Sequence, residues 1–217
     1  MKLVLFGISE LSRVLTEYFE EQGSKVSAYV IDEDYKNSET FNDRPVYTTD
    51  FFLNNFSKND YKIFICIGSQ KNNKPREEKY LFFKEKGYKF ESFIHKDVSI
   101  ASNVKFGEHL LILEKNNIQH FCEIEDNVFI WSCNHIGHST KLEKNVFVSS
   151  NITISGCVLI KKNTFIGVGC TIANNLCIGK NNFLSNGCHM TVNTKDNEIY
   201  KSEKPKLLNA KTNKLIK

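Results

Sequence analysis

The stretch FIWSCNHIGHSTKL, residues 129–142, has a bulky aliphatic residue at every sixth position, at Ile130, Ile136 and Leu142. The same six-residue spacing extends in both directions without a polar interruption. The sixteen positions are Ile100, Phe106, Ile112, Ile118, Ile124, Ile130, Ile136, Leu142, Val148, Ile154, Ile160, Ile166, Ile172, Ile178, Leu184 and Met190. Six residues are too few for a repeat that contains a helix, but they suit a short strand and a turn. The spacing therefore predicts a parallel β-helix of three-strand coils, in which residues eighteen apart lie on top of one another.

Glycine often follows the aliphatic residue, at Gly107, Gly137, Gly167 and Gly179. Glycine and asparagine tolerate turn conformations that strain other residues. We expect these glycines, and the asparagines of the repeat, to take the strained turn conformation.

The N-terminal part alternates between apolar strand-like segments and amphipathic helix-like segments. The expected strands cover residues 2–8, 25–32, 62–69 and 88–95, and the expected helices begin near Ser9 or Glu10 and after Gln70. This alternation is typical of an α/β domain with a parallel, Rossmann-like sheet. We predict an α/β domain over residues 1–95, a β-helix over 96–192 and a C-terminal tail over 193–217.

Parallel sheets bind ligands beyond the carboxyl ends of their strands, which directs attention to the turns after each predicted strand. The first turn keeps only Gly7 of the three glycines in a dinucleotide fingerprint, and Ser9 follows it. Asp32 ends the second strand, where an acidic side chain would meet a ribose or a base. On these residues alone, an ordinary strand–turn–helix remains an equal alternative.

The composition is that of a soluble protein. The net charge of +4 is mild and the basic residues are scattered, which argues against nucleic-acid binding. The apolar run at the start is too short for a signal peptide, and no segment has the length of a membrane span. We expect a cytoplasmic protein with no membrane contact. Seven cysteines without a CxxC pair indicate structural thiols.

Taken together, the repeat and the preceding sheet domain resemble the hexapeptide-repeat sugar acyltransferases. The resemblance is to the branch that includes sialic-acid O-acetyltransferases and N-acetyltransferases acting on nucleotide-linked amino sugars. It implies a left-handed β-helix, acetyl-CoA as cosubstrate, and a homotrimer with active sites between subunits. It also implies that the sheet domain holds the nucleotide-sugar, and the residues here that match its loops are Gly7, Ser9, Asp32 and Gly68.

The richest polar stretch of the repeat contains His135 and His138. One coil above His138 the spacing places Gly156, so that an imidazole would face a bare backbone N–H with room for a thioester. An imidazole is suited to accept a proton from an amine, and a rigid N–H is suited to stabilise an oxyanion. The resemblance makes His138 the general base and leaves His135 as base, orienting group or substrate contact.

In the related enzymes an acidic residue follows the general base, whereas Ser139 stands here. Asn134, His135 or a neighbouring subunit therefore remain as groups that would orient the imidazole, and Asn134 is also a predicted substrate contact. Zinc held by His120, His135 and His138 is a less favoured alternative. We expect no metal.

By resemblance, the small residues Gly156, Gly167 and Ala173 would lie along the pantetheine arm of acetyl-CoA, although turn geometry explains them equally well. Phe129 and Trp131 are candidates for a subunit contact or a sugar-stacking surface. The tail carries four lysines that would meet coenzyme phosphates or only solvent, namely Lys206, Lys211, Lys214 and Lys217.

These features predict N-acetylation of a nucleotide-linked amino sugar. The stretch 114–140 is most similar to enzymes acting on a 4-amino-4,6-dideoxyhexose for surface-polysaccharide synthesis, including lipopolysaccharide O-antigen. Two alternatives stay open: O-acetylation of a sugar hydroxyl with the same base and donor, and a noncatalytic β-helix that binds a nucleotide-sugar.

Overall fold

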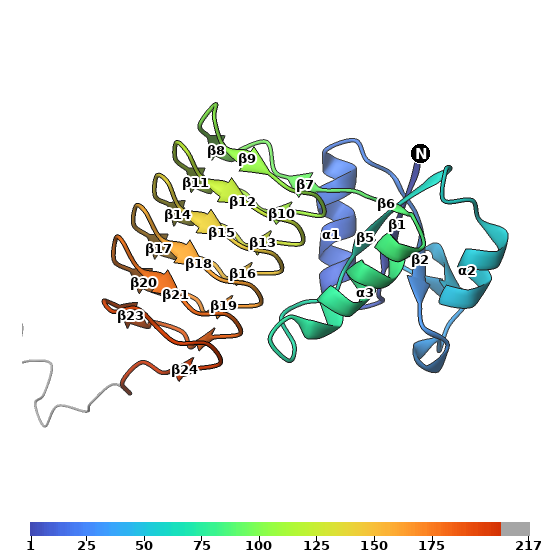
Figure 1. Ribbon diagram of the computed structural model, residues 1–217. Helices are drawn as coiled ribbons and strands as arrows, with labels where there is room; N and C mark the ends of the chain where they lie inside the picture. The colour runs from blue at the N-terminus through green and yellow to red at the C-terminus, as the bar shows by residue number, and fades with distance from the viewer. Residues whose placement is uncertain (205–217) are drawn as a thin grey trace, which may run out of the picture.

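The structure, a computed structural model, describes residues 1–204 and consists of an α/β domain beside a stack of triangular coils (Figure 1). The four tail lysines at 206, 211, 214 and 217 lie outside the described residues. No helix within residues 1–204 combines the length and apolar character that a membrane crossing requires.

The α/β domain contains a six-stranded sheet in the order β3-β4-β2-β1-β5-β6, in which only β3 and β4 pair antiparallel. Its elements are β1 (Lys2–Phe6), α1 (Glu10–Glu21), β2 (Val26–Ile31), η1 (Glu33–Tyr35), β3 (Thr40–Phe41), β4 (Arg44–Thr48), α2 (Thr49–Asn55), β5 (Tyr61–Ile65), α3 (Lys74–Glu85) and β6 (Lys89–Phe90). Side chains alternate between the two faces of each strand. One face packs on α1 and the coils, and the other packs on α2 and α3.

The coil stack is built from two-residue parallel strands. They are β7 (Phe93–Ile94), β8 (Ser99–Ile100), β9 (Lys105–Phe106), β10 (Leu111–Ile112), β11 (Asn117–Ile118), β12 (Glu123–Ile124), β13 (Phe129–Ile130), β14 (His135–Ile136), β15 (Lys141–Leu142), β16 (Phe147–Val148), β17 (Thr153–Ile154), β18 (Leu159–Ile160), β19 (Phe165–Ile166), β20 (Thr171–Ile172), β21 (Cys177–Ile178), β22 (Phe183–Leu184), β23 (His189–Met190) and β24 (Ile199–Tyr200). The sixteen apolar positions of the six-residue period are the second residues of β8 to β23. From Ile112 to Met190 they are all buried, which confirms the predicted inward register.

The strands form three faces. Face 1 contains β7, β10, β13, β16, β19, β22 and β24; face 2 contains β8, β11, β14, β17, β20 and β23; and face 3 contains β9, β12, β15, β18 and β21. Corner A leads from face 1 to face 2, corner B from face 2 to face 3, and corner C from face 3 back to face 1. Residues eighteen apart are paired, as in Phe129 with Phe147 and His135 with Thr153.

The strained turn conformation recurs once per six residues, but not at the glycines for which it was predicted. Left-handed backbone occurs at His109, Lys115, Phe121, Asn127, Cys133, Ser139, Asn145, Asn151, Cys157, Asn163, Gly169, Asn175, Asn181 and Gly187. Asparagine is the commonest residue there, as expected, whereas Gly107, Gly137, Gly167 and Gly179 are absent from this set. A Cβ on Gly137 would lie 2.5 Å from the carbonyl carbon of Ser155 in the next coil. These glycines are therefore required by the close stacking of coils.

Face 1 is the surface against which the α/β domain packs. Phe129 is fully buried and stacks on Phe64 of β5, with ring centroids 5.6 Å apart. Leu15 and Phe19 of α1 belong to the same cluster, and Trp131 is half-buried against it. The prediction of Phe129 as a subunit contact or sugar surface is wrong, because the chain's own α/β domain covers it.

Candidate active site

His138 lies in corner B, in the turn between β14 and β15, with an exposed side chain. Its backbone is held on both sides by neighbouring coils. Its N–H donates to Oε1 of Gln119 at 2.9 Å, and its carbonyl accepts from the N–H of Cys157 at 2.8 Å. The turn therefore presents the imidazole from a rigid backbone.

The imidazole of His138 lies against Gly156 in the next coil. A Cβ built on Gly156 would lie 2.5 Å from Nε2 and 2.6 Å from Cε1 of the ring. No larger residue fits there without moving the ring. The Gly156 N–H donates to no group within residues 1–204. The histidine-beneath-glycine arrangement expected from the eighteen-residue spacing is therefore present.

The other ring nitrogen of His138, Nδ1, faces a thiol. Sγ of Cys157 lies 4.0 Å from it, and this is the one side-chain hydrogen bond of the ring among residues 1–204. Ser139, which stands where related enzymes carry an acidic residue, makes no side-chain bond to the imidazole in the same region. Cys157 is the neighbour that the sequence analysis missed, because it had been grouped with the structural thiols.

His135 is the first residue of β14 on face 2, three residues before His138. Its half-buried side chain lies between Asn117 and Thr153 of the adjacent strands. It is close to corner B along the chain and is placed to contact a ligand on face 2.

Asn134 is not brought to this site. It lies at corner A, at the other end of β14, and is 2% exposed. Its Nδ2 donates to the Trp131 carbonyl at 2.5 Å, and its Oδ1 accepts from the Ile152 N–H at 2.7 Å. Its side chain stabilises the coil stack, so the predicted roles as substrate contact or orienting group have no geometric support.

His120 lies one coil below His138, as the spacing predicted, since its carbonyl accepts from the Ser139 N–H at 2.9 Å. Its ring is hydrogen-bonded to Asn103, with Nδ1 of His120 3.1 Å from Oδ1 of Asn103. Within residues 1–204, no three His, Cys, Asp or Glu side chains form a group that would hold a metal ion. The zinc alternative therefore has no geometric support.

The three residues predicted to line the pantetheine arm do not share one corner. Gly156 and Ala173 lie on corner B, above His138. Gly167 lies on corner A, where a Cβ would come within 2.6 Å of the Asn186 backbone nitrogen. Close stacking accounts for Gly167, and only Gly156 and Ala173 are near the histidine.

In the α/β domain, β1 lies between β2 and β5, so the carboxyl ends of these strands meet. Gly7 follows β1 with φ of 108°, and a Cβ there would lie 3.2 Å from the Cys66 carbonyl oxygen after β5. Ser9 caps α1, and its hydroxyl accepts from the Ser12 N–H at 3.4 Å. A turn without a side chain at its start and a helix N-terminus both suit an anionic ligand.

Asp32, at the end of β2, is paired rather than free. Its Oδ1 accepts from Nζ of Lys79 at 2.7 Å and from Oγ1 of Thr49 at 2.9 Å. Gly68 follows β5, and its carbonyl accepts from Nη1 of Arg76 at 3.1 Å. Lys79 and Arg76, both on α3, are additions that the sequence analysis missed, because nothing in the pattern separates them from the other basic residues of that helix.

The two candidate sites of one chain lie on different sides of the coil stack. The α/β domain packs on face 1, whereas corner B joins faces 2 and 3 and is the opposite corner of the triangle. In Figure 1 the turn between β14 and β15 lies on the side of the stack away from α1 and α3. The domain therefore does not present a ligand to the His138 of its own chain.

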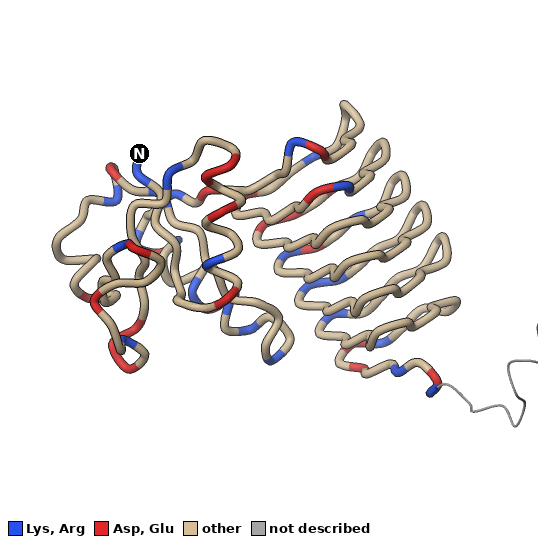
Figure 2. Tube along the Cα trace, turned by 180° about the vertical axis from the view of Figure 1, so that it is seen from behind, with Lys and Arg blue, Asp and Glu red and all other residues tan. Residues whose placement is uncertain are grey.

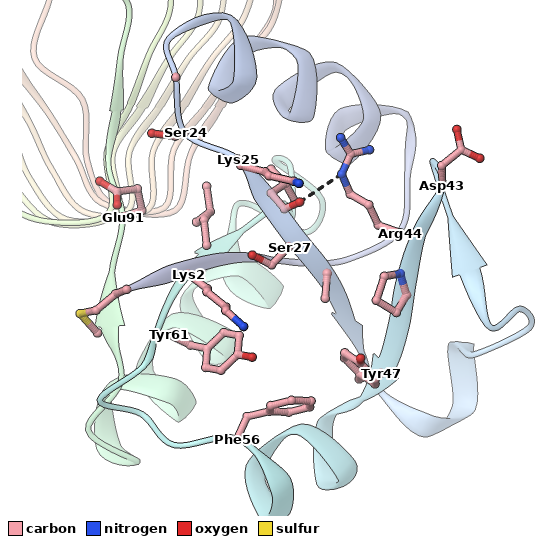
Figure 3. Close-up of a pocket in the computed structure, with 16 residues that line it drawn as sticks. Lys2, Ser24, Lys25, Ser27, Asp43, Arg44, Tyr47, Phe56, Tyr61 and Glu91 are labelled. Atoms are coloured by element: carbon pink, nitrogen blue, oxygen red, sulfur yellow. Dashed lines mark hydrogen bonds between the residues drawn. The ribbon is translucent and has the colours of Figure 1, made fainter.

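A cavity of about 1110 Å³ opens at the other edge of the sheet, at the amino ends of the strands (Figure 3). Lys2, Arg44, Tyr47 and Tyr61 are among its lining residues. The Arg44 guanidinium is engaged by Glu20 at 2.6 Å. None of the predicted site residues lines this cavity, so it is separate from both candidate sites.

Residues 2–81 match the family profile described as the PglD N-terminal domain. No curated protein sequence matches the chain.

Several solved structures share the whole two-part arrangement. The acetyltransferase domain of PglB from Neisseria gonorrhoeae is 21% identical with a TM-score of 0.82, over 93% of this chain and 96% of that one. PerB from Caulobacter crescentus, solved in complex with CoA and GDP-perosamine, is 20% identical with a TM-score of 0.83, over 93% of this chain and 94% of that one. WeeI from Acinetobacter baumannii is 19% identical with a TM-score of 0.63, over 92% of this chain and 95% of that one.

At these identities the likeness establishes the fold, a Rossmann-like domain followed by a left-handed β-helix, as predicted. Together with the N-terminal profile, it confirms at the level of the fold the predicted resemblance to the sugar acyltransferase branch that includes sialic-acid O-acetyltransferases and nucleotide-amino-sugar N-acetyltransferases. The PglB domain has also been solved with acetyl coenzyme A.

Proposed function

We propose that the protein transfers an acetyl group from acetyl-CoA to the amine of a nucleotide-linked amino sugar, with His138 as the general base. The observation that carries this proposal is the His138 imidazole held against Gly156, whose N–H has no acceptor within residues 1–204. A proton acceptor beside a fixed hydrogen-bond donor is what attack on a thioester requires.

In the proposed reaction, the sugar nitrogen attacks the thioester carbonyl carbon while His138 takes a proton from that nitrogen. The Gly156 N–H donates to the oxyanion of the tetrahedral intermediate. The carbon–sulfur bond then breaks, and the CoA thiolate leaves and takes up a proton as the new amide forms. Gly156 and Ala173 leave the pantetheine arm room to pass along corner B, and His135 contacts the acceptor.

The nucleotide half of the substrate would bind at the carboxyl ends of β1, β2 and β5. Gly7, Ser9 and Gly68 leave the backbone open there, and the Lys79 ammonium beside Asp32 supplies a cation for a diphosphate. Support comes from PerB, which was solved with CoA and GDP-perosamine. By the same analogy, we propose a 4-amino-4,6-dideoxyhexose as the sugar, and surface-polysaccharide synthesis in the cytoplasm as the setting.

A homotrimer would bring the two half-sites together, because the α/β domain of one chain cannot reach its own corner B. The outward residues of face 2 and the corner B turns contain no Asp, Glu, Lys or Arg from Ser99 to His189. Figure 2 shows uncharged turns along the edge of the stack away from the α/β domain. Phe121, on corner B, is 67% exposed. Subunit interfaces are depleted of charged residues and enriched in aromatic residues.

The direct test is a panel of UDP-, GDP- and dTDP-linked amino sugars with acetyl-CoA, read as thiol release and by mass of the product. An acetylated amine is expected. An acetylated hydroxyl would instead identify an O-acetyltransferase, and tight sugar binding without thiol release would identify a noncatalytic protein.

The matching variant is His138→Asn. It should lower kcat by about two to four orders of magnitude, the usual contribution of a general base. Far-UV circular dichroism and the melting temperature should stay unchanged, because the side chain is exposed. Near-normal turnover in this variant would remove His138 from the mechanism.

A further inference from the structure

The segment between β5 and α3, residues 66–73, starts at the carboxyl end of β5 and carries Gly68. Three successive residues in it, Lys71, Asn72 and Asn73, have left-handed backbone, with φ of 48°, 52° and 65°. Side chains disfavour this conformation, and it normally occurs at single residues. Three in a row persist only where the surrounding structure holds them.

The coil stack provides that support at corner C. Asn73 is fully buried. Its Nδ2 donates to the Asn163 carbonyl at 3.4 Å, and its own carbonyl accepts from Nδ2 of Asn145 at 3.2 Å. Nδ2 of Asn72 donates to the Asn181 carbonyl at 2.8 Å. The left-handed segment is therefore bonded to three successive turns of one corner of the β-helix.

Arg76 connects the start of the segment to the same corner. Its Nη1 donates to the Gly68 carbonyl at 3.1 Å. Its Nη2 donates to the carbonyls of Asn145 at 3.1 Å and Asn127 at 3.4 Å. The guanidinium lies 4.2 Å from the ring centroid of Phe129. One side chain thus joins the loop after β5 to two coils.

Burying the charged Arg76 side chain between α3 and corner C carries a desolvation cost. Arg76 is fully buried and forms no ion pair with a carboxylate within residues 1–204. Burial lowers the pKa of its guanidinium to about 9, so the group remains charged at neutral pH. An apolar side chain would fill the volume without the desolvation cost, but only a planar fork donates to carbonyls on both sides.

We infer that Arg76 is a positioning residue for the nucleotide half of the active site. By clamping the Gly68 carbonyl to corner C, it keeps the loop 66–73, with its left-handed residues 71–73, in place beside the bound nucleotide. The inference rests on the proposed function for the identity of the ligand. Arg76 touches no substrate itself and acts through the loop.

The test compares Arg76→Met with the wild-type protein in two measurements. Hydrogen–deuterium exchange of residues 66–73 should become about tenfold faster, because the clamp on the segment is lost. The KM for the nucleotide-sugar should rise about tenfold, while the KM for acetyl-CoA stays within about twofold. Arg76→Lys keeps the charge without the fork and should fall between the two proteins.

Lys84→Met is the matched control. Lys84 is also on α3 and pairs with Glu108 of corner C at 2.6 Å, but it does not contact the loop. This variant loses an interdomain contact and should leave both the exchange of residues 66–73 and the KM values unchanged.

Asn72→Gly is a milder second variant, because glycine keeps the left-handed backbone while the bond to Asn181 is lost. It should give a smaller rise both in the exchange rate of residues 66–73 and in the KM for the nucleotide-sugar.

Unchanged loop exchange in Arg76→Met and Asn72→Gly would overturn the inference. An equal rise in both KM values, or the same changes in Lys84→Met, would do so as well, because these outcomes indicate general loosening of the domain interface.

Calorimetry of the wild type with UDP, GDP and dTDP separates this inference from the proposed function. Binding without acetyl transfer defeats the proposed function alone, and the variants are then compared by Kd; absence of binding defeats both.

Discussion

Gly156 shows how closely a single residue is constrained by the ring beneath it. Its φ lies outside the left-handed region, so the backbone itself would accept a side chain. Only the ring of His138 stands in the way, with Nε2 2.5 Å from the position of an added Cβ. The requirement for glycine is therefore a requirement of the proposed base.

Gly156→Ala should consequently separate activity from stability. The methyl group displaces the imidazole, and kcat should fall by about two to three orders of magnitude, since the displaced base no longer reaches the acceptor. The melting temperature should change little, because the backbone accepts alanine and the ring is free to move into solvent. Steady-state kinetics and thermal denaturation on the same preparation measure both.

Ser155→Ala, in the same turn, serves as the control and should leave kcat unchanged. If Gly156→Ala kept full activity, the ring would not need its present position, and the proposed role of the pair would fail.

At this scale the sequence predicted what the period determines. The stacking of His138 under Gly156 follows from the eighteen-residue coil, and it is present. Side chains whose partners lie in the other domain were beyond prediction, because no spacing relates α3 to corner C. His109 is the clearest example, because nothing in the six-residue pattern marks it and the structure buries it completely.

Among the elements, His109 attaches β5 to corner C. Its Nε2 accepts from the Ile65 N–H at 2.8 Å, and its Nδ1 lies 2.7 Å from Oδ1 of Asn127. Both contacts suit the neutral ring, with the proton on Nδ1 donated to Asn127. Burial lowers the pKa of His109 to about 3, assisted by the nearby Arg76 charge.

The attachment of β5 should therefore weaken in acid. In the unfolded chain His109 titrates near pH 6.5, so below that pH the unfolded state binds the extra proton and stability falls as the pH is lowered toward 3. Between pH 6.5 and 5 the contribution is about 2 kcal/mol of unfolding free energy. Denaturant unfolding at several pH values, compared with His109→Gln, measures it. Parallel pH profiles for the two proteins would contradict the prediction.

Element boundaries show where local pattern was insufficient. The single strand predicted over 88–95 is two strands, β6 in the sheet and β7 in the first coil, because the chain passes between the domains there. β4 and α2 went unpredicted: β4 has a proline at its second position, and α2 has only seven residues. By contrast, α1 begins at Glu10 with Ser9 as its N-cap, as predicted.

At the scale of the whole molecule, the proposal places each active site between two chains, and mixed trimers test it. One chain carries His138→Asn, and the other carries Lys79→Ala in the nucleotide half-site. Each variant alone should be inactive or nearly so. Random mixing should restore about a quarter of wild-type activity, because one site in four then pairs an intact His138 with an intact α/β domain of a neighbour.

Subunits are mixed by co-expression with two affinity tags, and sedimentation of the mixture checks that trimers form. Separately purified variants combined without exchange of subunits give the baseline. Mixed trimers no more active than this baseline would show that each site belongs to a single chain.

The pairing of residues eighteen apart also limits how a gene for this protein can change in length. Loss of six codons from the repeat between positions 100 and 138 would keep every later aliphatic side chain inside but rotate all later residues by one side of the triangle, carrying the histidine to a different corner. Only whole turns of the prism, eighteen codons at a time, can be gained or lost without that rotation. Related genes should therefore differ in this half by multiples of eighteen codons, or by insertions confined to the corner loops.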